Sequence, residues 1–197
     1  MQLDLSRITP LCLASLLTAG CAGFSADGGF APVQQTAKAR LGMQVVMARS
    51  DAEREQIDRR VAELLAQPVS ADAAVQIALL NNRGLQAAFL ELGITEAELV
   101  QAGRLPNPGF SFGRFTQGDE VEREFGLHFN LARLIAMPML QQVQSRRFAQ
   151  AQGMAAMNVL SLAADTRKAW VMAVAAEETV RYTQQVMRAA EAGAELA

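Results

Sequence analysis

The middle of the chain changes from helix to strand at a pair of prolines, and few folds accommodate that order. Pro106 and Pro108 each lack a backbone N–H and push the preceding residue away from helical geometry. A helix therefore cannot continue through residues 105–108, and a new element must begin at Gly109. The sequence predicts a helix–strand break at Pro106 and Pro108.

The residues after the break predict a β-hairpin with one apolar face and one small, polar face. Residues 109–115 form a first run, and residues 125–131 form a second run that alternates with period two. A polar stretch at 118–120 separates them. The predicted apolar face holds Phe110, Phe112, Phe125, Leu127, Phe129 and Leu131, and the predicted polar face holds Gly126, His128 and Asn130.

The apolar face of this hairpin needs a cover. The flanking helices look like long rods and not like a layer that could bury a sheet. Strands of outer-membrane barrels carry the same alternation, apolar toward lipid and polar toward the lumen, with roughly 9–11 residues per crossing. We therefore expect the apolar face to meet lipid and the polar face to line a duct, although Arg114 and Phe115 depart from the alternation.

The first twenty residues resemble a lipoprotein signal peptide. Arg7 precedes a mostly apolar run at 8–17, and Ala19-Gly20 precede Cys21. In such signals the cysteine is acylated and becomes the first residue after cleavage. We predict a signal peptide at 1–20 and a lipid anchor on Cys21 in the outer membrane, with the helices in the periplasm. No internal disulfide is expected, because Cys12 lies inside the signal.

The rest of the chain predicts helices. Residues 21–36 are predicted to be a flexible tether, and residues 37–67 an N-terminal amphipathic helix with a capping box from Ser50 to Glu53. Ser70 can cap a further helix that runs to about residue 103. A last helix from Met139 onward would reach about 90 Å if straight. Apolar residues recur at steps of three and four in both, which is typical of coiled coils.

Composition and motifs argue against several functions. The net charge of −2 and the 19% of charged residues offer no basic patch for nucleic acid. The single histidine makes no metal site, and nine methionines are more typical of gap filling than of metal handling. Ser111, Asp119 and His128 follow the hydrolase order, but that elbow needs a strand-to-helix turn, whereas this segment predicts a hairpin. We predict no enzyme activity, cofactor or metal.

Residues 70–82, residues 98–108 and the aromatic hairpin after them together resemble the first repeat of the TolC-like outer-membrane efflux family. The resemblance covers residues 68–197, and the signal peptide is similar to that of lipoprotein members. It implies a mainly α fold with a β-hairpin, in which long coiled-coil-like helices flank two strands of a transmembrane β-barrel. It also implies a homotrimer that docks on a periplasmic adaptor and an inner-membrane pump, as a passive export duct for solutes such as drugs or metal ions.

The resemblance covers one helix–hairpin–helix repeat, whereas members of the family carry two. The sequence therefore predicts a truncated form of such a subunit. Two alternatives stay open: a periplasmic structural lipoprotein whose helices form a coiled coil capped by the hairpin, and a non-functional fragment. Nothing in the sequence identifies the solute or the pump.

Overall fold

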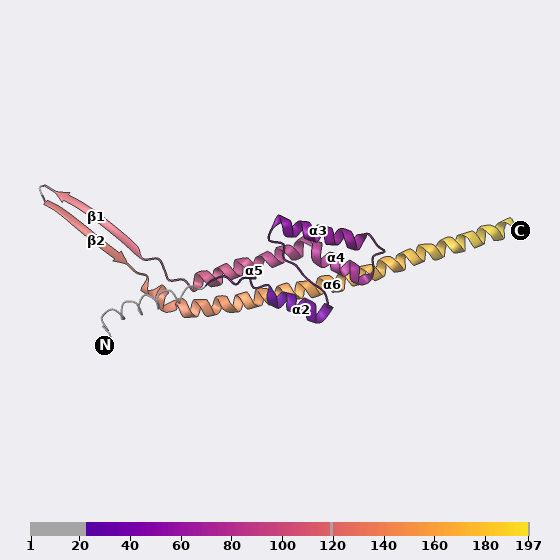
Figure 1. The fold of residues 1–197 in the computed structure, drawn as a ribbon, viewed down its shortest axis with the longest axis horizontal. Helices are drawn as coiled ribbons and strands as arrows, with labels where there is room; N and C mark the ends of the chain where they lie inside the picture. Colours follow the sequence, from indigo (N-terminus) through magenta and orange to yellow (C-terminus); the bar gives the residue numbers. More distant parts are fainter. Residues whose placement is uncertain (1–22, 119, 197) are drawn as a thin grey trace, which may run out of the picture. The chain divides into compact units, whose positions relative to one another are not determined.

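The computed structural model describes residues 23–118 and 120–196, without the side chain of Gln117. The predicted signal peptide at 1–20 and the predicted lipid anchor Cys21 lie outside the described residues. In chain order (Figure 1) the elements are α2 (Ala31–Leu41), α3 (Asp51–Leu65), α4 (Ala71–Asn81), α5 (Arg83–Ala102), β1 (Gly109–Gln117), β2 (Glu120–His128) and α6 (Leu131–Glu195). The fold is mainly α-helical with a two-stranded antiparallel hairpin, as predicted.

The chain divides into two compact units. The helical unit comprises residues 29–92 and 151–197, and the hairpin unit comprises residues 93–150 together with the segment that ends at Gly28. Helices α5 and α6 each contribute residues to both units.

The core of the helical unit centres on Phe89 of α5, which is fully buried. The ring of Phe30, just before α2, meets it edge-on with centroids 4.7 Å apart. Helix α6 adds buried small side chains at a spacing of four residues, which places them on one helix face. Buried residues of the unit include Val33, Ala37, Val45, Val75, Leu79, Leu85, Leu92, Ala155, Val159 and Ala163.

Helix α3 begins with the predicted capping box. The Ser50 hydroxyl accepts a hydrogen bond from the Glu53 amide at 3.2 Å, and the Glu53 carboxylate accepts from the Ser50 amide at 3.1 Å. These bonds satisfy amides that the first helical turn leaves without partners. Farther along α3, Ile57 and Val61 pack against Leu80 of α4.

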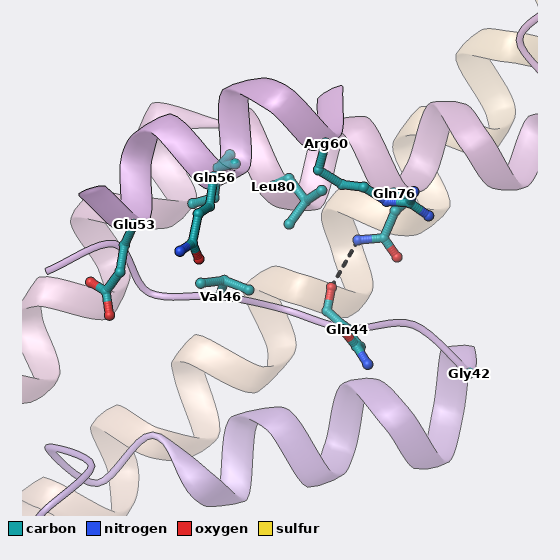
Figure 2. Close-up of a pocket in the computed structure, with 9 residues that line it drawn as sticks. Gly42, Gln44, Val46, Glu53, Gln56, Arg60, Gln76 and Leu80 are labelled. Atoms are coloured by element: carbon teal, nitrogen blue, oxygen red, sulfur yellow. Dashed lines mark hydrogen bonds between the residues drawn. The ribbon is translucent and has the colours of Figure 1, made fainter. Parts of the chain in front are cut away.

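An extended segment at 42–50 connects α2 to α3, and glutamine side chains hold its backbone. The Gln76 amide donates to the Gln44 carbonyl at 3.0 Å, and Figure 2 shows this bond in the groove below α3. Gln86 donates to the Val46 carbonyl at 2.8 Å and accepts from the Ala48 amide at 3.1 Å. The glutamines thus supply hydrogen bonds that a neighbouring strand would otherwise provide.

The N-terminal helices differ from the prediction. Residues 31–36, predicted as part of a flexible tether, lie in α2, where Val33 is fully buried. Within the segment 37–67, the helix expected from the capping box onward is α3, whereas residues 37–41 belong to α2, because Gly42 ends α2 in the left-handed conformation with φ 67°. Glycine takes this conformation at helix ends without steric cost.

The helix predicted from Ser70 to about residue 103 is also interrupted. Ser70 caps α4 as predicted, but Asn82 leaves the helical conformation with φ −74° and ψ 114°. Its side-chain oxygen accepts from the Leu85 amide at 2.9 Å and so caps α5. An asparagine side chain competes for backbone amides in this way, which ends one helix and starts the next.

Helix α6 begins earlier than predicted. Asn130 caps it by accepting from the Arg133 amide at 2.9 Å, so the helix starts at Leu131 and not near Met139. Pro138 lies inside the helix, where its missing N–H removes one main-chain hydrogen bond. Leu131, predicted as a strand residue, is therefore helical.

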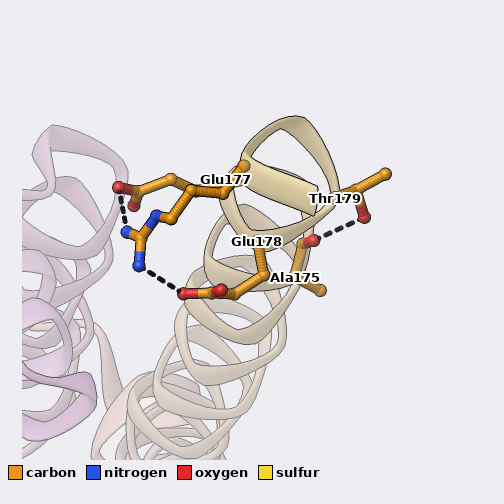
Figure 3. Close-up of polar contacts among 5 residues, drawn as sticks. Ala175, Glu177, Glu178 and Thr179 are labelled. Atoms are coloured by element: carbon orange, nitrogen blue, oxygen red, sulfur yellow. Dashed lines mark hydrogen bonds and ion pairs between the residues drawn. The ribbon is translucent and has the colours of Figure 1, made fainter. Parts of the chain in front are cut away.

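The last part of α6 is exposed from Val171 onward. Side chains of the same helix pair there: Arg181 bonds the carboxylates of Glu177 and Glu178, both at 2.9 Å, and the Thr179 hydroxyl donates to the Ala175 carbonyl (Figure 3). Ion pairs such as the two of Arg181 each stabilise an isolated helix by about 0.2–0.5 kcal/mol.

Replacing Phe89 by Ala is expected to destabilise the helical unit by about 3–5 kcal/mol, because it leaves a cavity beside Phe30. Urea unfolding followed by far-ultraviolet circular dichroism measures the change. The control is Leu90→Ala, since Leu90 is exposed, and its effect should stay within about 0.5 kcal/mol. Equal effects of the two substitutions would contradict the assigned core.

The capping box should make stability depend on pH. The Arg49 amide, which donates to Glu53 at 2.7 Å, is the main cause that lowers the pKa of Glu53 below its usual 4.5, and bonds with Ser50 add to it. At a pH between the folded-state and the unfolded-state pKa of Glu53, the unfolded chain therefore binds more protons than the folded chain. The Glu53 carboxylate thus stabilises the fold at a pH above its unfolded-state pKa. This stabilisation is lost as the pH falls through its lowered, folded-state pKa.

Glu53→Gln should flatten this dependence in urea unfolding between neutral and acidic pH. Glu55→Gln on the same helix serves as the matched control and should retain it. An unchanged pH profile in the Glu53 variant would show that the capping carboxylate does not contribute.

Candidate functional site

The predicted break and hairpin are both observed. Helix α5 ends at Ala102, residues 105–108 with their two prolines have no regular structure, and β1 starts at Gly109. The strands pair from Gly109 opposite His128 to Gln117 opposite Glu120. Gly118, which directly follows β1, has φ 64°, a conformation that favours glycine. Residues opposite one another share a face, so this register fixes the composition of both faces.

The first half of the hairpin has an apolar face. Phe110 lies opposite Leu127 and Phe112 lies opposite Phe125, and the centroids of the last two rings are 5.1 Å apart. All four side chains are 57% to 71% exposed, and no other described element covers them. These four predicted apolar-face residues are thus brought together. Phe129, in contrast, lies beyond the end of β2.

The opposite face of the same half is small and polar. Gly109 lies opposite His128 and Ser111 lies opposite Gly126. The Ser111 hydroxyl is 3.1 Å from Nε2 of His128. A side chain at Gly126 would collide with the Ser111 hydroxyl, so the contact depends on this glycine. Gly126 and His128 share this face, while the third predicted member, Asn130, instead caps α6.

The half of the hairpin near the turn carries charged residues on both faces, unlike the first half. On the apolar side, Arg114 lies directly opposite Arg123, and Thr116 lies opposite Val121. On the other side three glutamates face the partner strand's residues, with the pairs Gly113 and Glu124, Phe115 and Glu122, and Gln117 and Glu120. Both strands keep strict alternation through this half, so Arg114 and Phe115 do not break the strand. They change only what each face presents.

A segment from the start of the described chain is docked in the hairpin unit. The Ser25 amide donates to the Glu96 carboxylate at 2.6 Å, and the Ser25 hydroxyl donates to the same oxygen. Glu96 is only 5% exposed and is the single buried charged residue in the described chain. The charged acceptor strengthens both bonds, which fix Ser25 to α5.

The residues before Ser25 lie close to the base of the hairpin. Phe24 lines a recess together with Val100, Leu105, Pro106 and Arg133. Gly23 lines a second recess with Leu99 and Pro138, among others. The segment thus borders the same recesses as residues that lead into β1 and that follow β2.

The arrangement of the described residues favours a surface that binds other molecules over a reactive site. Register brings Ser111 and His128 together, but Ser111 lies inside an antiparallel strand and not at a strand-to-helix elbow. Asp119 lies outside the described residues. Within the described chain, no cluster of three histidine, cysteine or acidic side chains could hold a metal ion.

None of the described helices combines the length and the apolar character needed to cross a membrane.

Comparison with known proteins identifies no relative: no family model, curated protein or solved structure matches this chain.

Sequence reasoning missed the docked segment and the arginine pair. Ser25 and Glu96 are 71 residues apart, and no local pattern links them. A glutamate at an otherwise apolar helix position was the available signal, because it implies a buried partner. The pairing of Arg114 with Arg123 follows from the register in which Gln117 lies opposite Glu120, and the Gly-Asp pair in the sequence between them could have indicated it.

Removing the Glu96 carboxylate should release the docked segment. Glu96→Ala leaves the Ser25 amide and hydroxyl without their acceptor, at a local cost of about 2 kcal/mol. Hydrogen exchange at the Ser25 amide should become roughly thirtyfold faster. Glu98→Ala, on the exposed side of the same helix, is the matched control and should leave exchange unchanged. Equal exchange in both variants would contradict the docking.

Proposed function

We propose that this chain is a subunit of an outer-membrane efflux duct, anchored by an acylated Cys21 and inserted through its hairpin. It acts as a passive conduit and not as an enzyme. The observation that carries the proposal is that the exposed aromatic face of the hairpin and the segment following Cys21 lie at the same place, at the hairpin base.

The aromatic face is unusual for a surface in water. A lone two-stranded hairpin is marginally stable in water, and the four apolar side chains at its first half gain nothing from exposure. Grouped exposed apolar residues typically mark a membrane or protein interface. Lipid is the favoured cover, because the opposite face carries Gly109, Ser111, Gly126 and His128, the small and polar kind that borders water in membrane barrels.

The position of the docked segment is a second argument that lipid covers the apolar face. Two peptide units separate Gly23 from Cys21 and span at most about 7 Å. An acyl chain on Cys21 would therefore start close to Leu105, Pro106 and the first strand. Anchor and hairpin would enter one leaflet side by side, although they were predicted from separate parts of the sequence.

The hairpin requires further strands. In the described chain each strand pairs on one side only, and free backbone groups at a strand edge are not tolerated in hydrocarbon. Additional copies of the chain can pair these edges, in agreement with the homotrimer that the family resemblance implies. A periplasmic adaptor and an inner-membrane pump are the further partners of this proposal, and drugs or metal ions are its candidate solutes.

A coiled-coil periplasmic lipoprotein is the second candidate, favoured by one observation. The exposed end of α6 carries large apolar side chains, including Val171, Met172, Val180, Val186 and Met187. Another helix could cover them whether or not the hairpin enters a membrane. The two proposals therefore differ in the position of the hairpin and agree on the helices.

Spin labels at neighbouring positions of β2 test insertion. Acylation of Cys21 would leave no free thiol in the mature chain, so Leu127→Cys and His128→Cys can each be labelled alone. The label at 127 should be more accessible to oxygen, which concentrates in lipid, and the label at 128 to a water-soluble nickel reagent. Reversed accessibilities of the two labels would contradict the proposed orientation of the hairpin. Equal exposure of both labels to water would contradict its insertion into the membrane.

An epitope inserted after Gly118 separates the two candidates. In the duct the turn of the hairpin reaches the outer surface, so antibody should bind intact cells. Insertion at this turn is favourable because Gly118 is exposed and, among the described residues, nothing outside its chain neighbours lies within 4 Å of where its Cβ would be. Binding only after the outer membrane is permeabilised would favour the periplasmic lipoprotein. The same epitope placed between α3 and α4, near residue 67, should remain hidden in both cases.

A further inference from the structure

The recess beside Phe24 combines two cations with apolar walls. Arg104, just after α5, and Arg133, in the first turn of α6, both line it. Apolar walls come from Phe24, Val100 and Leu105, and all of these residues belong to the hairpin unit. The volume of the recess is about 540 Å³, within the range of roughly 300–1,000 Å³ that small-molecule sites occupy. The recess can therefore hold a charged group that is joined to an apolar body.

The polar groups of the recess favour an anion. Among the described residues neither arginine takes part in an ion pair. Arg133 lies at the N-terminal end of a helix, where aligned peptide dipoles favour negative charge, and the first turn of α6 holds no acidic residue. The side-chain amides of Gln101 and Asn107 also line the recess and can donate hydrogen bonds. Two guanidinium groups and a helix N-terminus thus act in the same direction.

The margin of the recess is apolar and exposed. Phe24 and Leu105 are 59% and 66% exposed. Leu131, Leu134 and Ile135, in the first turns of α6 around Arg133, are exposed as well. A phosphate that carries acyl chains would fill the charged recess and cover this margin, whereas a free phosphate ion would leave the apolar side chains in water. The margin therefore favours a lipid as the source of the anion.

We propose that this recess binds the phosphate of a membrane phospholipid at the base of the hairpin. A guanidinium group binds phosphate through two parallel hydrogen bonds, which suits Arg104 and Arg133 to this ligand. The inference rests on the proposed function, in which the hairpin and the lipid anchor enter one leaflet at this base. Arg104 precedes β1 and Arg133 follows β2, so neither lies in the part of the hairpin that crosses the hydrocarbon.

Binding can be measured in the assembled, acylated protein in a non-ionic detergent. Ala132→Cys, in the first turn of α6, carries an environment-sensitive fluorescent label. Three probes are titrated: dihexanoyl phosphatidylglycerol, dihexanoylglycerol, which lacks the phosphate, and inorganic phosphate. We expect the phospholipid to bind roughly tenfold more tightly than either of the others, because it alone satisfies the arginines and covers the apolar margin.

Charge variants test whether the arginines hold the phosphate. Arg104→Gln with Arg133→Gln should weaken phospholipid binding roughly a hundredfold, about tenfold for each charged donor. The corresponding double lysine variant should retain part of the affinity, because lysine keeps the charge without the paired hydrogen bonds. Arg146→Gln with Arg147→Gln removes the same charge at exposed positions of α6 outside the recess and should leave binding unchanged.

Folding of the variants is checked by far-ultraviolet circular dichroism. Arg104 and Arg133 are exposed, so their replacement by glutamine is expected to preserve the fold. If the double variant loses helical signal, the two single glutamine variants take its place, and each should weaken binding roughly tenfold.

The outcomes separate this inference from the proposed function. Phospholipid binding that survives the glutamine variants, or equal binding of dihexanoylglycerol, would overturn the phosphate site. Equal binding of inorganic phosphate would overturn the lipid source, and equal loss in the Arg146 and Arg147 variant would reduce the effect to net charge. Water exposure of both spin labels at 127 and 128 would overturn insertion, and with it the membrane as the source. A lipid-exposed label at 127 without phospholipid binding at the recess would overturn this inference alone.

Discussion

The backbone constraint at Pro106 and Pro108 decides how the apolar residues of this chain are used. Before the prolines, α5 follows a helical period and buries one side, with Phe89 and Leu92 fully covered. After them the period is two, and the same kind of side chain is displayed on one face of a hairpin. Two missing N–H groups thus separate a segment that packs within the chain from a segment that requires an external cover.

The two units consequently differ in where their stability comes from. The helical unit has a core of its own, closed by Phe30 and Phe89 and by the small side chains of α6. In the hairpin unit, burial is limited to Glu96, Val100 and Ala102 among the described residues. Its specific contact is polar, the pair of bonds from Ser25 to Glu96. In the proposed duct, the membrane and neighbouring copies of the chain supply the apolar burial that this unit lacks.

Local chemistry made part of this structure predictable. Proline geometry, the Ser50–Glu53 capping box and the period of two in residues 125–128 each act within a few residues, and all appear in the fold. Asn82 and Asn130 carry equally local capping signals, but each competes with an apolar pattern that continues across it. There the side-chain bond to the backbone prevailed over periodicity.

The rest could not be predicted because it depends on distant residues. Helix α2 has a composition typical of a tether, and the residues just before it are held from far along the chain: Phe30 by the ring of Phe89, and the Gly29 carbonyl by the amide of Gln152, 123 residues away. The docking of Ser25 on Glu96 is of the same kind. Both link the segment after the predicted anchor to helices far along the chain.

The faces of the hairpin also show why residue type alone was insufficient. Taken one by one, Arg114 and Phe115 depart from the predicted alternation, because each has the wrong polarity for its position. Register shows that the strand continues and that Phe115 covers Gly113, where an added Cβ would lie 2.7 Å from the ring. Arg114 is matched by Arg123 at the same level. The change in polarity is therefore a property of the paired hairpin, and neither strand shows it when it is taken alone.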